Sequence, residues 1–327
     1  MKAFVLRSYG SPDVLDLTDV DTPVPGDDEV LVRVRATSVN PYDWHMMRGE
    51  PYVARLMGGL GLRAPKLSVL GTDVAGQVEA VGRNVTGFRP GDEVFALLKE
   101  GGFAEYVCVA EDELAPKPKN LSYGQAAAVP MAAVTALLGL RDDGRIRPGQ
   151  RVLVNGASGG VGTFAVQLAR AFGAEVTGVC RTGNVELVRS IGAHEVVDYV
   201  KEDFAREGRR YDLLLDVAGS RPVSACRRAL LPKGTHVLVG GPGGRWLRPV
   251  DHIFSALATS PFVSQRTVRT DTTRCAENRR NLMALTELIE AGKVTPVIDR
   301  QYPFEETRAA VAYQEEGHAQ GKVVITL

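Results

Sequence analysis

The pattern of hydrophobic and polar positions changes character near Pro118. Before it, short segments alternate apolar and polar residues with a period of two, which is typical of half-buried β-strands. Turn-forming pairs, Pro25-Gly26 and Pro90-Gly91, separate these segments. The strand candidates are Glu29–Ala36, Val74–Val81 and Glu93–Leu98. The first third of the chain therefore predicts a β-rich domain.

After Pro118 the pattern becomes one of alternating helices and strands. An alanine-rich segment, Ser122–Leu140, predicts a helix with Ser122 as its N-cap. Short apolar strands then alternate with helical segments, as in a doubly wound parallel sheet. The predicted elements are Arg151–Asn155, Gly162–Phe172, Glu175–Val179, Asn184–Ile191, Glu195–Val197, Leu213–Asp216, Ser224–Leu230 and His236–Val239. A helix at Glu277–Ala291 follows, and the segment Tyr302–Leu327 predicts a last helix and strand.

A glycine-rich turn joins the first of these strands to its helix, in the stretch RVLVNGASGGVGTFAVQLARAFG at Arg151–Gly173. Strand, glycine turn and helix form the context that a dinucleotide-binding fingerprint requires. A side chain at Gly159 would hold a pyrophosphate away from the main chain, and bulk at Gly162 would push the helix off the sheet. The alternative is a structural turn in an unrelated α/β protein. The predicted cofactor-binding residues of the turn are Ala157, Ser158, Gly159, Gly160, Val161 and Gly162.

The end of the next strand indicates which dinucleotide binds. In this fold an acidic residue there favours NAD, whereas a basic residue accommodates the 2′-phosphate of NADP. Glu175–Val179 is followed by Cys180, Arg181 and Thr182, without a carboxylate. We therefore predict NADPH as the cofactor, with Arg181 as a binding residue. In the alternative, Arg181 points to solvent and either cofactor is accepted.

Composition and charge narrow the classes of function. The 327 residues are enough for two domains, and 39 basic residues balance 39 acidic ones, which argues against a nucleic-acid partner. No apolar span of membrane length and no signal-peptide pattern is present, so no membrane partner is expected. The four cysteines form no CxxC pair and suit a cytoplasmic protein.

Several segments resemble, in register, the motifs of the medium-chain dehydrogenase/reductase superfamily, and specifically of its zinc-free quinone oxidoreductase branch. The segments are Ser38–Asp43, Gly71–Gly76, Phe88–Val94, Gly102–Val107, Ala157–Gly162, Asp198-Tyr199, Asp216–Gly219 and Gly321–Ile325. The resemblance runs nearly from end to end. It implies an α/β protein with a GroES-like β-rich catalytic domain and a doubly wound Rossmann domain, assembled as a homodimer. We expect the GroES-like domain at residues 1–122 and 293–327 and the Rossmann domain at residues 123–292.

The zinc-ligand positions of the superfamily hold other residue types in this chain. By the resemblance, Asn40 replaces the first cysteine, Thr72 replaces the histidine, and the third ligand position falls near Met131. An amide, a hydroxyl and a thioether do not form a competent zinc site. The segment of the structural zinc, Leu97–Val107, lacks its closely spaced cysteines. We therefore predict that no metal is bound.

The expected absence of zinc directs the choice of reaction. Without a Lewis acid a simple ketone is hard to polarise, whereas a conjugated acceptor spreads the charge of the transferred hydride over an enolate. The resemblance implies NADPH-dependent reduction of a quinone or an α,β-unsaturated carbonyl. Two alternatives remain. One is an enoyl-thioester reductase, with Arg55, Arg63 and Lys66 as a basic entrance; the other is a non-catalytic NADPH-binding sensor or scaffold.

The resemblance also implies roles for residues outside the glycine turn. Asn40 is expected to face the nicotinamide ribose and the substrate, and Tyr42 and His45 to orient the substrate or donate a proton. The alternatives are a turn residue at Asn40 and packing groups at Tyr42 and His45. Asp73 is expected to pair with an arginine or the backbone, in a folding role. The other expected cofactor contacts are Thr135, Tyr199, Gly219, Gly240, Gly241 and Lys322, the last with a solvent-exposed strand lysine as its alternative.

The glycine-broken segment Gly49–Ser68 is expected to determine substrate choice. Tyr52, Leu56 and Met57 would line a lid over an apolar acceptor. The alternative is a packed connector.

Overall fold

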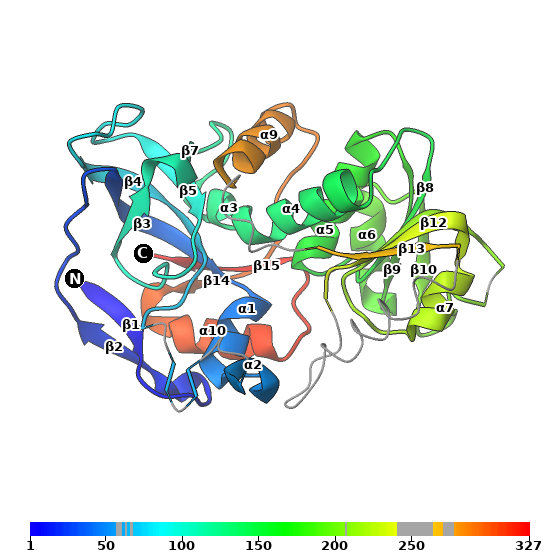
Figure 1. Ribbon diagram of the computed structural model, residues 1–327, viewed down its shortest axis with the longest axis horizontal. Coiled ribbons are helices and arrows are strands. Elements are labelled where there is room, and N and C mark those ends of the chain that lie inside the picture. The colour runs from blue at the N-terminus through cyan, green and yellow to red at the C-terminus, as the bar shows by residue number, and fades with distance from the viewer. Residues whose placement is uncertain (57–60, 63, 66–67, 207, 241–263, 271–277) are drawn as a thin grey trace. The chain divides into compact units, whose positions relative to one another are not determined.

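The computed structural model describes residues 1–327 except 57–60, 63, 66–67, 207, 241–263 and 271–277. The chain folds into two compact units (Figure 1). The first comprises Met1–Val134, Arg274–Glu290 and Pro296–Leu327, and the second comprises Thr135–Thr273 and Ala291–Thr295. The chain thus builds most of the first unit, then most of the second, and returns to the first, except that the short segment Ala291–Thr295 belongs to the second unit.

A largely antiparallel sheet forms the centre of the first unit. Its order is β14-β15-β3-β4-β5-β7, with β6 also paired to β3 and with β14 and β15 parallel. The alternating valines of β3 are buried because that face packs on the apolar residues of β4 and β5. The strands of this sheet are β3 (Glu29–Val39), β4 (Asp73–Val81), β5 (Glu93–Leu97), β6 (Tyr106–Ala110), β7 (Leu114–Pro116), β14 (Ile298–Pro303) and β15 (Lys322–Thr326). Strands β1 (Lys2–Leu6) and β2 (Leu15–Asp19) form a separate two-stranded antiparallel sheet. The helices are α1 (Pro41–Arg48), α2 (Tyr52–Leu56), α3 (Tyr123–Ala127), α9 (Asn278–Glu290) and α10 (Thr307–Glu315).

The second unit contains a parallel sheet of order β10-β9-β8-β11-β12-β13, in which every described pair of neighbours is parallel. This order confirms the predicted doubly wound sheet, and it reverses direction beside β8, the strand that precedes the glycine turn. The strands are β8 (Arg151–Asn155), β9 (Glu175–Cys180), β10 (Glu195–Asp198), β11 (Tyr211–Asp216), β12 (Leu230–Leu238) and β13 (Arg266–Arg269). The helices are α5 (Gly160–Ala171), α6 (Val185–Ser190) and α7 (Val223–Arg228).

The predicted helix over Ser122–Leu140 is divided in the structure. Ser122 is the N-cap of α3, as predicted, and its hydroxyl accepts a hydrogen bond from Gln125 N. A second helix, α4 (Pro130–Leu137), begins at a proline and continues into a π-helical turn, Leu138–Asp143. Since proline has no N–H to donate, it favours the start of a helix over its interior. The expectation of helix was right, and the expectation of one continuous helix was wrong.

Two helical segments that the sequence pattern assigned to the Rossmann domain belong to the first unit by their contacts. Helix α3 packs on β3 and β4. Helix α9 contacts β5 and β7, and its last turn is held by Asn120, whose side chain donates to Ile289 O at 2.9 Å. Among the described helices, none has the length and apolar character needed to cross a membrane.

Candidate functional site

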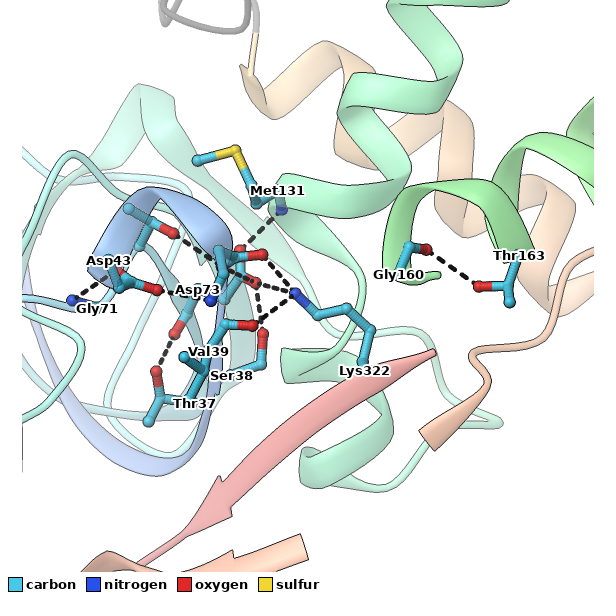
Figure 2. Close-up of polar contacts among 12 residues, drawn as sticks. Thr37, Ser38, Val39, Asp43, Gly71, Asp73, Met131, Gly160, Thr163 and Lys322 are labelled. Atoms are coloured by element: carbon cyan, nitrogen blue, oxygen red, sulfur yellow. Dashed lines mark hydrogen bonds and ion pairs between the residues drawn. The ribbon is translucent and has the colours of Figure 1, made fainter. Parts of the chain in front are cut away.

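Three neighbouring strands of the first unit bring a set of polar side chains together. In the register of the sheet, Ser38 of β3 lies opposite Asp73 of β4, and Val39 lies opposite Val323 of β15. Asn40 follows β3, Asp73 begins β4 and Lys322 begins β15. The strand pairing therefore places these side chains in one buried cluster, in which Lys322 reaches from β15 toward Asp73 (Figure 2).

The carboxylate of Asp73 is the centre of this cluster. Its Oδ2 accepts hydrogen bonds from Ser38 Oγ at 2.5 Å, Asn40 Nδ2 at 2.9 Å and Lys322 Nζ at 3.2 Å. Its Oδ1 accepts from Met131 N at 2.7 Å. Asp73 is fully buried and Lys322 is 3% exposed. Burying both charges is tolerable because they are paired and hydrogen-bonded.

The cluster also fixes the side chain of Asn40. Its Nδ2 donates to Thr72 Oγ1 at 3.0 Å and to Asp73, and its Oδ1 accepts from Lys322 Nζ. The ammonium group can only donate, so the carbonyl end of the amide must face Lys322. Both N–H groups of the Asn40 amide are therefore directed at acceptors within the protein. The predicted donation from Asn40 to ribose or substrate would require one of these bonds to open.

The glycine turn of the second unit has the geometry that its sequence predicts at two positions. A Cβ on Gly162 would collide with Gly156 O and Ala157, so this glycine is required for helix α5 to approach the turn. A Cβ on Gly159 would meet only Gly156 O, at 3.7 Å. The protein itself therefore leaves space at Gly159, beside the N-terminus of α5, where free N–H groups favour an anion. Thr163 stabilises this first turn through its hydroxyl, which donates to Gly160 O at 3.0 Å (Figure 2).

Gly156 is a site residue that the sequence pattern did not single out. It has a φ of 91°, a left-handed conformation that favours glycine, and it turns the chain directly after β8. Ala157, which follows, is buried and donates its N–H to Val179 O at 3.0 Å. The tight turn thus depends on Gly156, and Ala157 occupies a position where glycine is not needed.

The residues predicted to bind the adenosine end of the dinucleotide, Arg181 and Tyr199, lie at neighbouring strand ends. Arg181 follows β9 and is exposed, and Tyr199 follows β10 and is 52% exposed. The two strand ends are tied together by Tyr199 N, which donates to Cys180 O at 3.0 Å. Lys201 pairs with Asp198 beside them, at 3.5 Å. The structure therefore brings Arg181 and Tyr199 to the same edge of the sheet.

Comparison with known proteins agrees with this geometry. The chain matches the alcohol dehydrogenase GroES-like domain over residues 26–119 and the zinc-binding dehydrogenase family over residues 191–325. It is 33% identical to the chloroplast envelope quinone oxidoreductase homolog of Arabidopsis thaliana, over 99% of this chain and 98% of the relative. It is 36% identical to the NADPH-dependent alkenal/one oxidoreductase of Arabidopsis thaliana, over 99% of this chain and 79% of the relative. The chain belongs to the medium-chain dehydrogenase/reductase superfamily, among its quinone-oxidoreductase-like members.

A solved structure gives the same fold assignment for this medium-chain dehydrogenase/reductase. The quinone oxidoreductase from Coxiella burnetii superposes with a TM-score of 0.86 at 28% identity, covering 100% of this chain and 99% of that one. The GroES-like domain and the doubly wound domain implied by the sequence motifs are therefore confirmed.

The zinc that one family description implies does not fit the residues present. The Oδ1 of Asn40 accepts from the Lys322 ammonium, whose positive charge would repel a metal ion bound there. Thr72 offers a neutral hydroxyl, and the Met131 contact is its main-chain N–H on Asp73. Zinc sites of this kind use thiolate, imidazole or carboxylate ligands. Among Asn40, Thr72, Asp73, Met131 and Lys322, only Asp73 offers such a ligand, and its carboxylate is already paired with Lys322. The three predicted replacement positions, Asn40, Thr72 and Met131, do lie around one cluster, as the resemblance implied.

The structure also shows the surroundings of the predicted catalytic residues. His45 stacks on Trp44 with ring centroids 3.6 Å apart, and its Nδ1 is buried without a hydrogen-bond partner among the described residues. Burial lowers the pKa of His45, an effect that Glu50 and Glu315 oppose, so its imidazole is neutral at neutral pH. Tyr42 is half-buried and carries an interaction of its own. The roles of Tyr42 and His45 stay predictions.

The remaining predicted site residues lie in different parts of the two units. The guanidinium of Arg55 lies over the rings of Tyr9 and Tyr52, at 4.0 and 4.8 Å. The lid role of Tyr52, Leu56 and Met57 stays a prediction. Leu56 ends α2, and Met57 and Gly241 lie outside the described residues. Thr135 is buried in α4, and Gly219 and Gly240 lie after β11 and β12. The alternative of a solvent-exposed Lys322 was wrong, because its ammonium is buried on Asp73.

Asp43 is a second buried carboxyl that the sequence pattern did not single out. Its Oδ2 accepts from Asn40 N at 2.7 Å and its Oδ1 accepts from Gly71 N at 3.2 Å, which joins α1 to the segment before β4. Burial raises the pKa of Asp43 to about 7, and the nearby charge of Asp73 adds to this effect. Two backbone hydrogen bonds and Lys322 oppose it without cancelling it.

The raised pKa of Asp43 gives an expected dependence of stability on pH. The folded state holds the proton up to about pH 7, whereas the unfolded chain releases it near the ordinary aspartate value of 3.8. Between these values unfolding releases a proton, so rising pH should lower the free energy of unfolding by at most about 1.4 kcal/mol per pH unit. Urea unfolding of the wild type and Asp43→Asn between about pH 5 and pH 8 measures this component. Parallel pH profiles for the two proteins would contradict the assignment to Asp43.

Proposed function

We propose that the protein is a zinc-independent, NADPH-dependent oxidoreductase that transfers a hydride to a quinone or an α,β-unsaturated carbonyl. The observation that carries this proposal is the cluster of Asn40, Thr72, Asp73 and Lys322. Asn40 and Thr72 stand at two of the three zinc-ligand positions that the resemblance implies, and Met131, near the third, donates its N–H to Asp73. Relatives named as quinone and NADPH-dependent alkenal/one oxidoreductases support the substrate class.

The preference for NADPH rests on the charge at the end of β9. NADPH, when bound, supplies a hydride to the electrophilic carbon of the acceptor. In the protein, the space at Gly159 admits the pyrophosphate to the N-terminus of α5, and the exposed guanidinium of Arg181 offers a partner for the 2′-phosphate. Tyr199, exposed at the adjacent strand end, offers a ring for stacking or an edge contact.

The chain's own part in the reaction is to orient groups and to supply a proton. Lys322 and Asp73 hold the Asn40 amide in one orientation at the start of α1, the helix that also carries Tyr42 and His45. A conjugated acceptor becomes an enolate after hydride addition and needs hydrogen-bond donors and a proton. Because His45 is neutral at neutral pH, it would act there as a neutral donor; Tyr42 and water are the other candidate donors.

A panel assay tests the proposal. Purified protein with a chelator should oxidise NADPH faster than NADH in the presence of quinones or enones, and Arg181→Ala should reduce that preference by about tenfold. Enoyl thioesters in the same panel test the thioester reductase alternative. Activity that a chelator removes and zinc restores would overturn the metal-free assignment. Tight NADPH binding without turnover of any acceptor would favour the sensor or scaffold.

Cytoplasmic location, assembly as a homodimer and the absence of nucleic-acid and membrane partners stay predictions. Two relatives bear chloroplast names, so their location gives no support to a cytoplasmic one.

A further inference from the structure

A fully buried carboxylate, Asp216, lies at the carboxyl end of β11 in the second unit. Its Oδ1 accepts from Asn155 Nδ2 at 2.7 Å and from Gly219 N at 2.9 Å. Its Oδ2 lies 3.3 Å from His236 Nε2 and accepts from Cys226 Sγ at 3.8 Å. Asp216 therefore joins residues from β8, β12, α7 and the turn before α7.

The position of Asp216 in the sheet places these contacts at the expected dinucleotide crevice. Asp216 lies opposite Asn155 of β8 on one side and opposite Leu238 of β12 on the other. The pair β8 and β11 is where the strand order reverses, and open parallel sheets bind dinucleotides in the crevice at the carboxyl ends of such strands. The hydrogen bond from Asn155 to Asp216 thus crosses the base of that crevice.

Main-chain contacts reinforce the same junction. Val217 N and Ala218 N donate to Asn155 O at 3.0 and 3.2 Å, and a Cβ on Gly156 would meet the Cβ of Ala218 at 3.2 Å. The glycine turn after β8 and the turn after β11 are therefore in direct contact. A displacement of the second turn would move the first, and with it the N–H groups at the start of α5.

Asp216, Cys226 and His236 could also be considered a metal centre, because one potential ligand atom of each lies within 4.8 Å of the other two. Burial raises the pKa of the Cys226 thiol, and the Asp216 charge adds to it, so the sulfur keeps its proton. The thiol then donates to Oδ2 of a carboxylate whose Oδ1 already accepts from Asn155 and Gly219. Hydrogen bonding accounts for this arrangement without a cation.

We propose that Asp216 is a positioning residue for the dinucleotide: its carboxylate locks the glycine turn and the β11–α7 turn in the arrangement that receives the pyrophosphate and the nicotinamide half. This inference rests on the proposed function, since it concerns the same cofactor. It predicts that loss of the carboxylate weakens binding of the whole dinucleotide. Binding of the adenosine end, which is assigned to Arg181 and Tyr199, should be preserved.

The test compares NADPH with adenosine 2′-monophosphate, a fragment that keeps the adenosine and its 2′-phosphate but lacks the pyrophosphate and the nicotinamide. Asp216→Ala should raise the Kd of NADPH by about tenfold or more, as expected for lost charge-assisted hydrogen bonds, and should change the Kd of the fragment by less than about twofold.

Two further variants separate positioning from a general loss of structure. Asp216→Asn should regain most of the affinity, because its amide oxygen can face Asn155 and Gly219 while His236 changes tautomer to accept from the amide. Asp212→Ala is the matched control, since Asp212 also joins β11 to β8, through Arg151 N at 2.9 Å, but at the opposite end of the strand. Its NADPH affinity should equal that of the wild type. Should Asp216→Ala not fold, Asn155→Val removes the bond across the crevice, together with the Asn155 donation to Ser220 Oγ at 3.2 Å, while the carboxylate stays in place. A weakening of about tenfold is again expected.

Several outcomes would overturn the inference. These are unchanged NADPH affinity in a folded Asp216→Ala protein, equal losses for NADPH and the fragment, or an equal loss in Asp212→Ala. A metal ion that purified wild type retains stoichiometrically and Cys226→Ala loses would show a metal centre instead. A wild type that binds no NADPH would instead overturn the proposed function.

Discussion

Lys322→Met should destabilise the protein by about 3–5 kcal/mol, the range measured when one partner of a buried ion pair is removed. Asp73 is fully buried, and Lys322 is the charged side chain that pairs with it. The hydrogen bonds from Ser38, Asn40 and Met131 remain in the variant, but none supplies a positive charge. Urea unfolding at neutral pH measures the loss.

A second substitution tests whether the unpaired charge is the cause of this loss. The double variant Asp73→Asn, Lys322→Met should recover much of the stability, since it leaves no unpaired charge.

An exposed ion pair provides the control for this experiment. Arg83 pairs with Asp27, and their side chains are 77% and 52% exposed. Arg83→Met should therefore cost less than about 1 kcal/mol. If Lys322→Met costs no more than Arg83→Met, the cluster does not contain a stabilising ion pair.

The contrast between Lys322 and the glycine turn shows which parts of the site were accessible to sequence analysis. The turn is local: strand, glycines and helix are adjacent in the chain, so spacing alone predicted Gly159 and Gly162, and both positions have the expected geometry. Lys322 and Asn40 are 282 residues apart, and they meet because β15 pairs with β3. Periodicity along one strand cannot specify its partner strand, so a solvent-exposed lysine was an equally good interpretation.

Asp73 shows, like Lys322, that sequence analysis does not identify a partner on a distant strand. Its residue type and position predicted an arginine or the backbone as its partner. The backbone partner is Met131 N, but the charged partner is Lys322 rather than an arginine, on a strand far away in the sequence. Helices α3 and α9 were likewise predicted as elements and placed in the other domain. Amphipathicity shows that a face is buried, whereas the element that covers the face depends on tertiary packing. Gly156 was missed because only the backbone conformation, a φ of 91°, distinguishes it from other glycines.

Substitution by valine at two glycines of one turn should have different effects, a loss of NADPH binding at Gly159 and a loss of stability at Gly162. Gly159→Val should fold normally and raise the Kd of NADPH by at least about 100-fold, because the new side chain occupies the space through which the pyrophosphate reaches the main chain. Gly159 has a φ of −83° and a ψ of 178°, an extended backbone that valine adopts readily. In the structure its Cβ would meet only Gly156 O, at 3.7 Å.

Gly162→Val should instead lower the free energy of unfolding by about 3 kcal/mol, since its Cβ collides with main-chain atoms of Gly156 and Ala157 that cannot yield without moving the turn. Urea unfolding and NADPH titration of both variants distinguish the two causes, because the first should fail in binding alone and the second in folding. Wild-type affinity in Gly159→Val would show that no pyrophosphate lies against that glycine. Wild-type stability in Gly162→Val would show that helix α5 does not need its close approach to the turn.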